Sequence, residues 1–325
     1  MHTLKHEATQ LTREVFTITF TLFKIMIPAI IIVKILVELG IVPYVAWALE
    51  PLMSFVGLPK EASIIWAATM LTSNYTGMVL FFQFFENEPI TVAQTTVLAS
   101  MMLMAHNMPT ECAIARKAGI KVIYAVVLRV GSGFLIGWIL HLLYSKTGML
   151  QDSNQLIWTP SETDDSLYGW LIQQLESLFY IFVMIAGLVF GLKILKLIGV
   201  EALLKMLLSP FLKMTGIHKD ATSFTLIGMT LGLAFGGGLL INEAKKGVLK
   251  KKDIFLSLSL LCLCHSLIED TILMFLIGAD LTSILLFRVV FSFVLMIFIS
   301  QCFKRLPEHS HHHFVVSVNN QGVTK

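Results

Sequence analysis

The sequence predicts an all-α polytopic membrane protein built from two inverted-topology repeats. Its composition, its apolar segments and an internal repeat lead to this prediction. Hydrophobic residues make up 56% of the 325 residues and charged residues only 14%, against about 25% charged residues in a typical soluble protein. These few charges are clustered along the chain, so they cannot cover the surface of a soluble fold. The composition therefore excludes an ordinary soluble protein.

Apolar segments of membrane-spanning length recur along the chain, since a spanning helix needs about 20 such residues. The clearest candidates are residues 16–39, 90–108, 122–144, 175–194, 254–268 and 281–303. Segments 62–82 and 221–241 are also long enough, but they have polar or glycine-rich centres. Backbone groups freed in such centres need partners inside the protein, so each segment is predicted to form a re-entrant hairpin of two half-helices. The amphipathic stretches before them, 43–55 and 199–214, are predicted to lie at the membrane interface.

An internal repeat aligns residues 20–130 with residues 179–289 without a gap, at an offset of 159 residues. Matching glycines, prolines, histidines and arginines are not explained by shared hydrophobicity. The identities include Pro51/Pro210, Gly77/Gly236, His106/His265 and Arg129/Arg288. A repeat at a fixed offset indicates two copies of one structural unit.

The charges of the loops predict how the two copies are oriented, because cytoplasmic loops collect Lys and Arg. The loop at 86–88 is acidic, whereas its equivalent at 245–252 carries five lysines. The loop at 116–121 is basic, whereas its equivalent carries Asp280. Corresponding loops are therefore predicted to lie on opposite sides of the membrane. Inverted repeats of this kind are typical of secondary transporters.

The predicted organisation has four regions. These are a first repeat at 1–145, an extracytoplasmic linker at 146–168, a second and inverted repeat at 169–305, and a cytoplasmic His-containing tail at 306–325. Each repeat is expected to contain three spanning helices, an interfacial helix and a re-entrant hairpin. We expect an integral protein of the bacterial inner membrane, with both termini in the cytoplasm.

Residues 49–62, Leu-Glu-Pro-Leu-Met-Ser-Phe-Val-Gly-Leu-Pro-Lys-Glu-Ala, precede the first polar-tipped hairpin, and residues 208–221 echo them. Both stretches resemble the nucleoside recognition, or Gate, domain family, and the resemblance covers nearly the whole chain as two Gate-like repeats. Such domains occur in concentrative nucleoside transporters, ferrous iron permeases and spore maturation membrane proteins. The resemblance implies a gated pore with two hairpins and leaves the substrate open. The chain lacks the Gly-x-x-x-x-Gly-Lys-Ser/Thr sequence that a GTPase half would carry.

A histidine followed five residues later by a carboxylate occurs in both copies, as His106 with Glu111 and His265 with Asp270. Ionisable residues at membrane depth are costly and usually functional. Pro109 is expected to break the first helix so that the two groups converge. The candidates for substrate or ion binding in this region are His106, Asn107, Glu111, His265, Glu269 and Asp270. The alternative is that each histidine only ties down a hairpin through hydrogen bonds.

The hairpin tips form a second candidate site, because half-helix ends expose unpaired backbone groups and a partial dipole charge. The candidates are Ser73, Asn74, Thr76, Gly236 and Gly237, with Gln83 and Asn242 at matching positions further along. The polar run of the first tip favours binding, whereas the glycines are equally compatible with close helix packing. Arg129 and Arg288 are expected to form structural salt bridges with carboxylates.

The leading hypothesis for function is a secondary transporter of a small polar or ionic solute, coupled through protonation of these histidines and carboxylates or through a bound cation. A divalent transition-metal permease is the second, with His106, Glu111, Cys264, His265 and Asp270 as ligands. A non-transporting scaffold, like the spore maturation proteins, is the third. The duplicated ionisable residues favour the first two.

Neither an enzyme nor a cofactor is expected, since no nucleophile–base pair is apparent. The expected partners are the solute or ion, a coupling proton or cation, and the lipid bilayer. A net charge of +3 is too small to suggest nucleic-acid binding. A homo-oligomer remains an open alternative.

Overall fold

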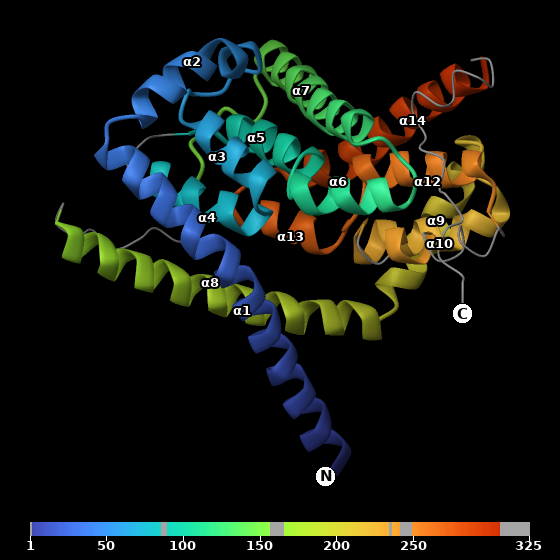
Figure 1. Cartoon of the computed structure of the whole chain (residues 1–325), viewed down its shortest axis with the longest axis horizontal. Helices are drawn as coiled ribbons and strands as arrows, with labels where there is room; N and C mark the ends of the chain where they lie inside the picture. The colour runs from blue at the N-terminus through green and yellow to red at the C-terminus, as the bar shows by residue number, and fades with distance from the viewer. Residues whose placement is uncertain (1, 86–89, 157–165, 234–235, 241–248, 306–325) are drawn as a thin grey trace, which may run out of the picture.

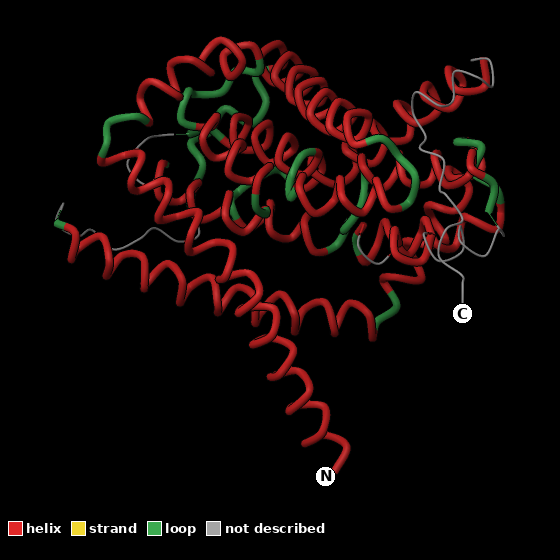
Figure 2. The backbone as a smooth tube through the Cα atoms, viewed as in Figure 1, coloured by secondary structure: helices red, strands yellow, loops and turns green. Residues whose placement is uncertain are grey.

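The computed structural model describes residues 2–85, 90–156, 166–233, 236–240 and 249–305. This part of the chain is α-helical, with a single isolated bridge between Thr91 and Ser153 in place of strands (Figure 2). The all-α class is therefore confirmed. The predicted tail at 306–325 and the loops at 86–88 and 241–248 lie outside the described residues, as do residues 157–165 of the linker.

The helices of the two halves follow each other in matching order. The first half contains α1 (His2–Glu38), α2 (Val42–Phe55), α3 (Ala62–Leu71), α4 (Asn74–Phe84), α5 (Val92–Met104), α6 (Met108–Lys117) and α7 (Val122–Thr147). The second half contains α8 (Leu167–Leu197), α9 (Val200–Met214), α10 (Lys219–Leu231), α12 (Lys251–Leu263), α13 (Glu269–Leu276), the π-helical η1 (Thr282–Phe287) and α14 (Arg288–Arg305). Both ends of α12 lie 159 residues after those of α5.

Three helices among the described residues are long and apolar enough to cross a bilayer: Val122–Thr147, Leu167–Leu195 and Thr282–Arg305. Large hydrophobic side chains on them are exposed, for example Val127, Phe179 and Phe298. A soluble monomer rarely exposes so much apolar surface, whereas lipid covers it in a membrane protein. The helix α8 crosses α1 on one side of the molecule, where Phe182 packs on Phe16 (Figure 1).

The prediction of a third continuous spanning helix in each half is wrong. Segments 90–108 and 254–268 were expected to be unbroken, but α5 and α12 end at Met104 and Leu263 and have 13 residues each. Thirteen residues extend about 20 Å, which is short of the roughly 30 Å hydrocarbon core. Each half therefore contains two interrupted helical segments instead of the one that was predicted. The first is the hairpin, and the second is the segment that begins with α5 or α12.

The loop that follows each of these helices contains a residue with left-handed backbone conformation, Asn107 in the first half and Ser266 in the second, with φ of 45° and 48°. Pro109 lies inside the first turn of α6, and the second half has the same break with Ile268 at the equivalent position. The expectation that Pro109 breaks the first helix is therefore wrong, because the chain leaves the helix before reaching it.

The helices α3 and α4 pack against each other and are separated at Thr72 and Ser73, where Ser73 caps α4. In the second half α10 ends at Gly232, whose φ of 102° suits only glycine. A Cβ atom added to Gly77 would collide with Thr69, and one added to Gly236 would collide with the backbone of Gly228. Each of these pairs thus brings two helical segments into close contact, which supports the packing role of Gly236.

Gly236→Ala is expected to destabilise the protein by about 1–3 kcal/mol, because the new methyl group meets backbone atoms of Gly228 that cannot move aside. Gly238→Ala is the matched control, since no atom of the described residues lies within 4 Å of its added Cβ. The control should be neutral or stabilising by up to about 1 kcal/mol, the helix preference for Ala over Gly. Thermal melting in detergent micelles measures both, and equal melting temperatures for the two variants would rule out the close contact.

Loops from both halves gather at the end of the molecule where α5 begins. The amide of Val92 donates to the carbonyl of Asp152 at 3.0 Å, and the amide of Asp280 donates to Thr96 Oγ1 at 2.9 Å. At the same end Tyr144, near the end of α7, donates to Ser283 Oγ at 2.6 Å. The helix α7 therefore ends where η1 begins.

The opposite end of the molecule holds the start of α7 and the first turns of α12. The hydroxyl of Tyr124 lies 2.9 Å from Ser259 Oγ, and its ring lies 5.1 Å from that of Phe255. The helix α12 thus begins near the start of α7, whereas α5 begins near its end. Consequently α5 and α12, which occupy equivalent places in the two halves, run in opposite directions.

Candidate functional site

Four ionisable side chains from the two halves meet where the broken helices end. His106 and His265 follow α5 and α12, while Glu111 and Asp270 lie in the first turns of α6 and α13. Their exposed fractions are 6%, 2%, 7% and 7% in that order. We call these four residues the His–acid site.

The short loops that carry the histidines are held by hydrogen bonds to their backbones. The amide of Asn107 donates to the carbonyl of Thr69 in the first hairpin at 3.1 Å. Arg129 Nη2 donates to the carbonyl of His106 at 2.9 Å, and Arg288 Nη2 donates to that of His265 at 3.0 Å. Both arginines are fully buried, and the same hydrogen bond therefore holds the equivalent loop in each half.

Each imidazole is oriented by the helix that precedes it. Nδ1 of His106 lies 3.0 Å from the carbonyl oxygen of Met102, and Nδ1 of His265 lies 2.6 Å from that of Leu261. A carbonyl oxygen only accepts hydrogen bonds, so both Nδ1 atoms carry the proton. Both Nε2 atoms then point into the site, where they lie 3.1 Å apart.

The carboxylates lie against the histidines of both halves. Glu111 Oε1 is 3.1 Å from Nε2 of His265 and 3.3 Å from Nε2 of His106. Asp270 Oδ2 is 3.5 Å from Nε2 of His106. Each histidine therefore contacts the acidic residue of the other half.

The two buried arginines differ in their relation to the carboxylates. Arg129 forms the expected ion pair with Glu111. Arg288 instead donates to two backbone carbonyls, those of His265 and Leu103, and no ion pair of Asp270 with an arginine occurs in the described part of the chain. Asp270 Oδ2 is buried and lacks a hydrogen-bond donor among those residues.

The first hairpin tip lies next to the His–acid site. Tyr75 donates to Glu269 Oε1 at 3.0 Å, which connects α4 with the residue before Asp270. Asn74 is 3% exposed, and neither atom of its amide has a hydrogen-bond partner among the described residues. The buried amide and the Tyr75–Glu269 pair offer a polar solute both donors and acceptors. Sequence reasoning missed Tyr75, although it lies inside the polar run of the tip.

The remaining candidates are placed elsewhere. Gln83, at the far end of α4, donates to Gln174 of α8 at 2.7 Å. Gly237 lies against Ile114 of α6. Cys264 is buried, and its sulfur is not among the converging ligand atoms. Asn242 lies outside the described residues.

Comparison with known proteins agrees with the resemblance seen in the sequence. Residues 19–121 match the Gate family, described as nucleoside recognition. The predicted resemblance is thereby confirmed for the first copy, and the matched range includes the first hairpin, α5 and α6. A membrane protein of Bacillus subtilis (strain 168), YvoD, described as uncharacterized, is 26% identical over 294 residues, which cover 89% of this chain and 93% of the relative. No solved structure matches the chain.

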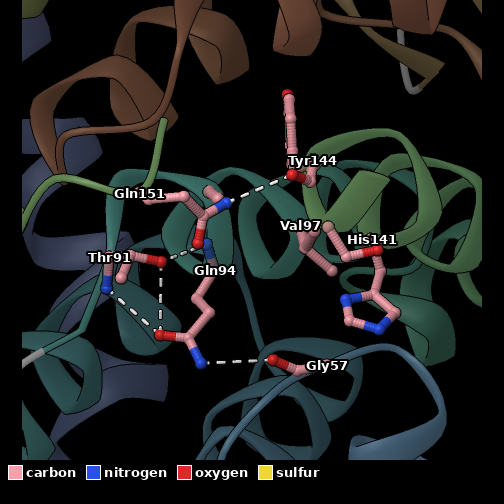
Figure 3. A pocket seen from close by; sticks show the side chains of 9 residues that line it. Gly57, Thr91, Gln94, Val97, His141, Tyr144 and Gln151 are labelled. Carbon is pink, nitrogen blue, oxygen red and sulfur yellow. Dashed lines mark hydrogen bonds between the residues drawn. The ribbon is translucent and has the colours of Figure 1, made fainter. Parts of the chain in front are cut away.

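A pocket of about 180 Å³ lies where the start of α5 meets the end of α7 (Figure 3). Gln94 donates to the carbonyl of Gly57 at 3.2 Å beneath it, and His141 lines its side. His141 lies 12 residues beyond Arg129 on α7, which is roughly 18 Å of helix. This histidine is therefore a suitable control for variants of the His–acid site.

Proposed function

We propose that the protein is a secondary membrane transporter, which moves a small polar or ionic solute by alternating access between two inverted repeats. The His–acid site would hold the solute or the coupling ion. The observation that carries this proposal is the convergence of His106, Glu111, His265 and Asp270 from equivalent positions of both halves in a buried site. Buried ionisable groups at a repeat interface mark solute and ion pathways in membrane proteins.

The direction of equivalent helices supports the inverted repeat. The helices α5 and α12 run oppositely, and η1, which leads into α14, begins at the end where α7 finishes. Two parallel copies related by an axis along the membrane normal would run in the same direction. The short loops at Asn107 and Ser266 are also equivalent, so the break in each half has the same construction.

The distribution of loop charges supports the proposed orientation. The end where α5 begins carries Asp152 and Asp280, whereas the opposite end carries Lys121 and Lys250 beside the starts of α7 and α12. By the positive-inside rule the lysine end faces the cytoplasm. We therefore propose an inner-membrane protein whose termini are both cytoplasmic and whose linker is extracytoplasmic.

The contacts across the site suit alternating access. Nε2 of each histidine faces the other half, while Nδ1 donates a hydrogen bond to a backbone carbonyl of its own half. Moving one half against the other would therefore separate the Nε2 atoms from the residues of the other half. The hydrogen bonds that hold each loop within its own half, from Arg129 or Arg288 and from Nδ1, would remain. A solute or ion that binds between the halves would bias this movement.

Uptake into reconstituted vesicles tests the proposal. Vesicles with the protein are offered radiolabelled nucleosides, amino acids and divalent cations in turn, under an imposed proton gradient. We expect saturable uptake of one class, absent from empty vesicles, reduced to background by His265→Ala and retained by His141→Ala. A protein that takes up none of these classes while remaining folded would favour the scaffold alternative, and equal loss in both variants would contradict a special role of the His–acid site.

A further inference from the structure

The four atoms that face each other in the His–acid site are all hydrogen-bond acceptors. Both Nδ1 atoms donate to carbonyl oxygens of Met102 and Leu261, so each neutral imidazole presents the lone pair of Nε2. The carboxylates Glu111 and Asp270 also present lone pairs. Nitrogen and oxygen lone pairs at 3.1–3.5 Å repel each other unless a cation lies between them.

We infer that the His–acid site binds one divalent transition-metal ion through Nε2 of His106, Nε2 of His265 and carboxylate oxygens of Asp270 and Glu111. Binding of the ion does not depend on the proposed transport function, whereas its role as cargo or coupling ion does. Ligand atoms of His106, His265 and Asp270 all lie within 4.8 Å of one another.

Four of the six distances among the ligand atoms are close to those of four-coordinate geometry. Metal bonds of about 2.0–2.1 Å to histidine and carboxylate require ligand atoms roughly 3.3–3.4 Å apart at the corners of a tetrahedron. The Nε2 atoms are 3.1 Å apart, Glu111 Oε1 is 3.1 and 3.3 Å from them, and Asp270 Oδ2 is 3.5 Å from that of His106. An ion at the centre of these atoms would thus need only small shifts of the side chains.

The surroundings of the four ligands also match those of a metal site. Histidine ligands usually donate their other ring N–H to a carbonyl or carboxylate, and carboxylate ligands are themselves hydrogen-bonded. Both histidines donate Nδ1–H to a carbonyl four residues earlier, and Arg129 holds Glu111. Asp270 Oδ2 is buried without a donor, as expected of an oxygen reserved for a cation.

The types of ligand indicate the class of ion. Imidazole nitrogens suit Zn²⁺, Fe²⁺ and Co²⁺, whereas Mg²⁺ and Ca²⁺ prefer oxygen ligands throughout. Cys264 is not among the residues whose ligand atoms converge, so the site lacks the soft sulfur that selects Cu⁺. Two imidazoles with two carboxylates therefore favour a borderline divalent ion such as Zn²⁺ or Fe²⁺.

Cobalt titration of the full-length protein tests the inference, because four-coordinate Co²⁺ absorbs visible light far more strongly than the hydrated ion. The protein is purified without a histidine tag and stripped with chelator. The histidines of the natural tail, His309, His311, His312 and His313, are replaced by glutamine in one variant so that they cannot contribute. We expect this variant to bind one Co²⁺ per chain, and Zn²⁺ to displace it.

Variants of the ligands decide which residues bind the ion. Asp270→Asn and His265→Gln should each weaken Co²⁺ binding at least about 100-fold, the upper range for loss of a supporting group, while His141→Ala keeps full affinity. Gel filtration checks that each variant is folded, and Asp270→Asn preserves the shape of the side chain. Retained binding in the ligand variants, or loss of all binding once the tail histidines are replaced, would overturn the inference.

A proton shared between the two Nε2 atoms is the competing explanation, and it predicts no saturable metal binding at neutral pH. In the cobalt titration, saturable binding would exclude the shared proton, and the absence of binding would exclude the metal site. Metal binding without any uptake in vesicles would leave the inference intact and contradict the proposed function. Chelator-insensitive uptake of an organic solute by a protein that binds no Co²⁺ would contradict the inference and support the proposed function.

Discussion

Glu111→Gln is expected to destabilise the protein by about 3–5 kcal/mol, because it leaves the guanidinium of a fully buried Arg129 without its counter-charge. Asp270→Asn is expected to leave stability nearly unchanged or to raise it, since no arginine in the described residues forms an ion pair with Asp270. The two carboxylates occupy equivalent positions and have equal exposure of 7%. The difference between the variants therefore isolates the effect of the ion pair.

Thermal or denaturant unfolding in nanodiscs measures this difference. The double variant Glu111→Gln with Arg129→Met removes both charges, and it should recover much of the loss because no buried charge then remains unpaired. Equal stability of Glu111→Gln and Asp270→Asn would contradict the asymmetry between the halves. Metal is kept out of the assay with chelator, because a bound ion would stabilise the parent protein and not the variants.

Single cysteines at positions 152 and 250 are expected to react from opposite faces of the membrane. Both native residues, Asp152 and Lys250, are exposed at opposite ends of the molecule. The lysine end is expected in the cytoplasm because positively charged loops are retained there. An impermeant maleimide should thus label Asp152→Cys in intact cells and Lys250→Cys only after the membrane is opened.

The background for this experiment replaces the native cysteines by serine. Cys302 is the essential change, because it is exposed whereas Cys112, Cys262 and Cys264 are buried. Cysteine at position 121 is the matched control, since Lys121 precedes α7 at the same end as Lys250. Labelling of positions 152 and 250 from one face would contradict the inverted topology, and different labelling of 121 and 250 would contradict the shared cytoplasmic end.

Local sequence was sufficient to predict the interruptions inside both hairpins. Thr72 and Ser73 compete with the backbone for hydrogen bonds and favour a cap over a continued helix, and α4 begins after Ser73. Gly232 adopts a φ that other residues rarely reach. Both signals act within a few residues, so no distant contact is needed to recognise them.

The early end of α5 and α12 was not predictable from the same local information. Residues 90–108 are apolar enough to continue as one helix, and the loop at His106 is fixed by Arg129, 23 residues later in the chain. The pairing of His106 with His265 joins residues 159 apart. Such contacts depend on how whole helices pack, and composition and periodicity carry no information about that packing.

The sequence by itself determined the all-α membrane class, the resemblance to the Gate family and the choice of the duplicated histidines and carboxylates as candidates. These follow from hydrophobicity, which sets where a segment resides, and from the cost of placing ionisable groups in an apolar environment. Only the tertiary structure decided that each histidine meets the carboxylate of the other half. It also decided that Glu111 is paired with Arg129 whereas Asp270 is not, because the reach of buried side chains across helices depends on their packing.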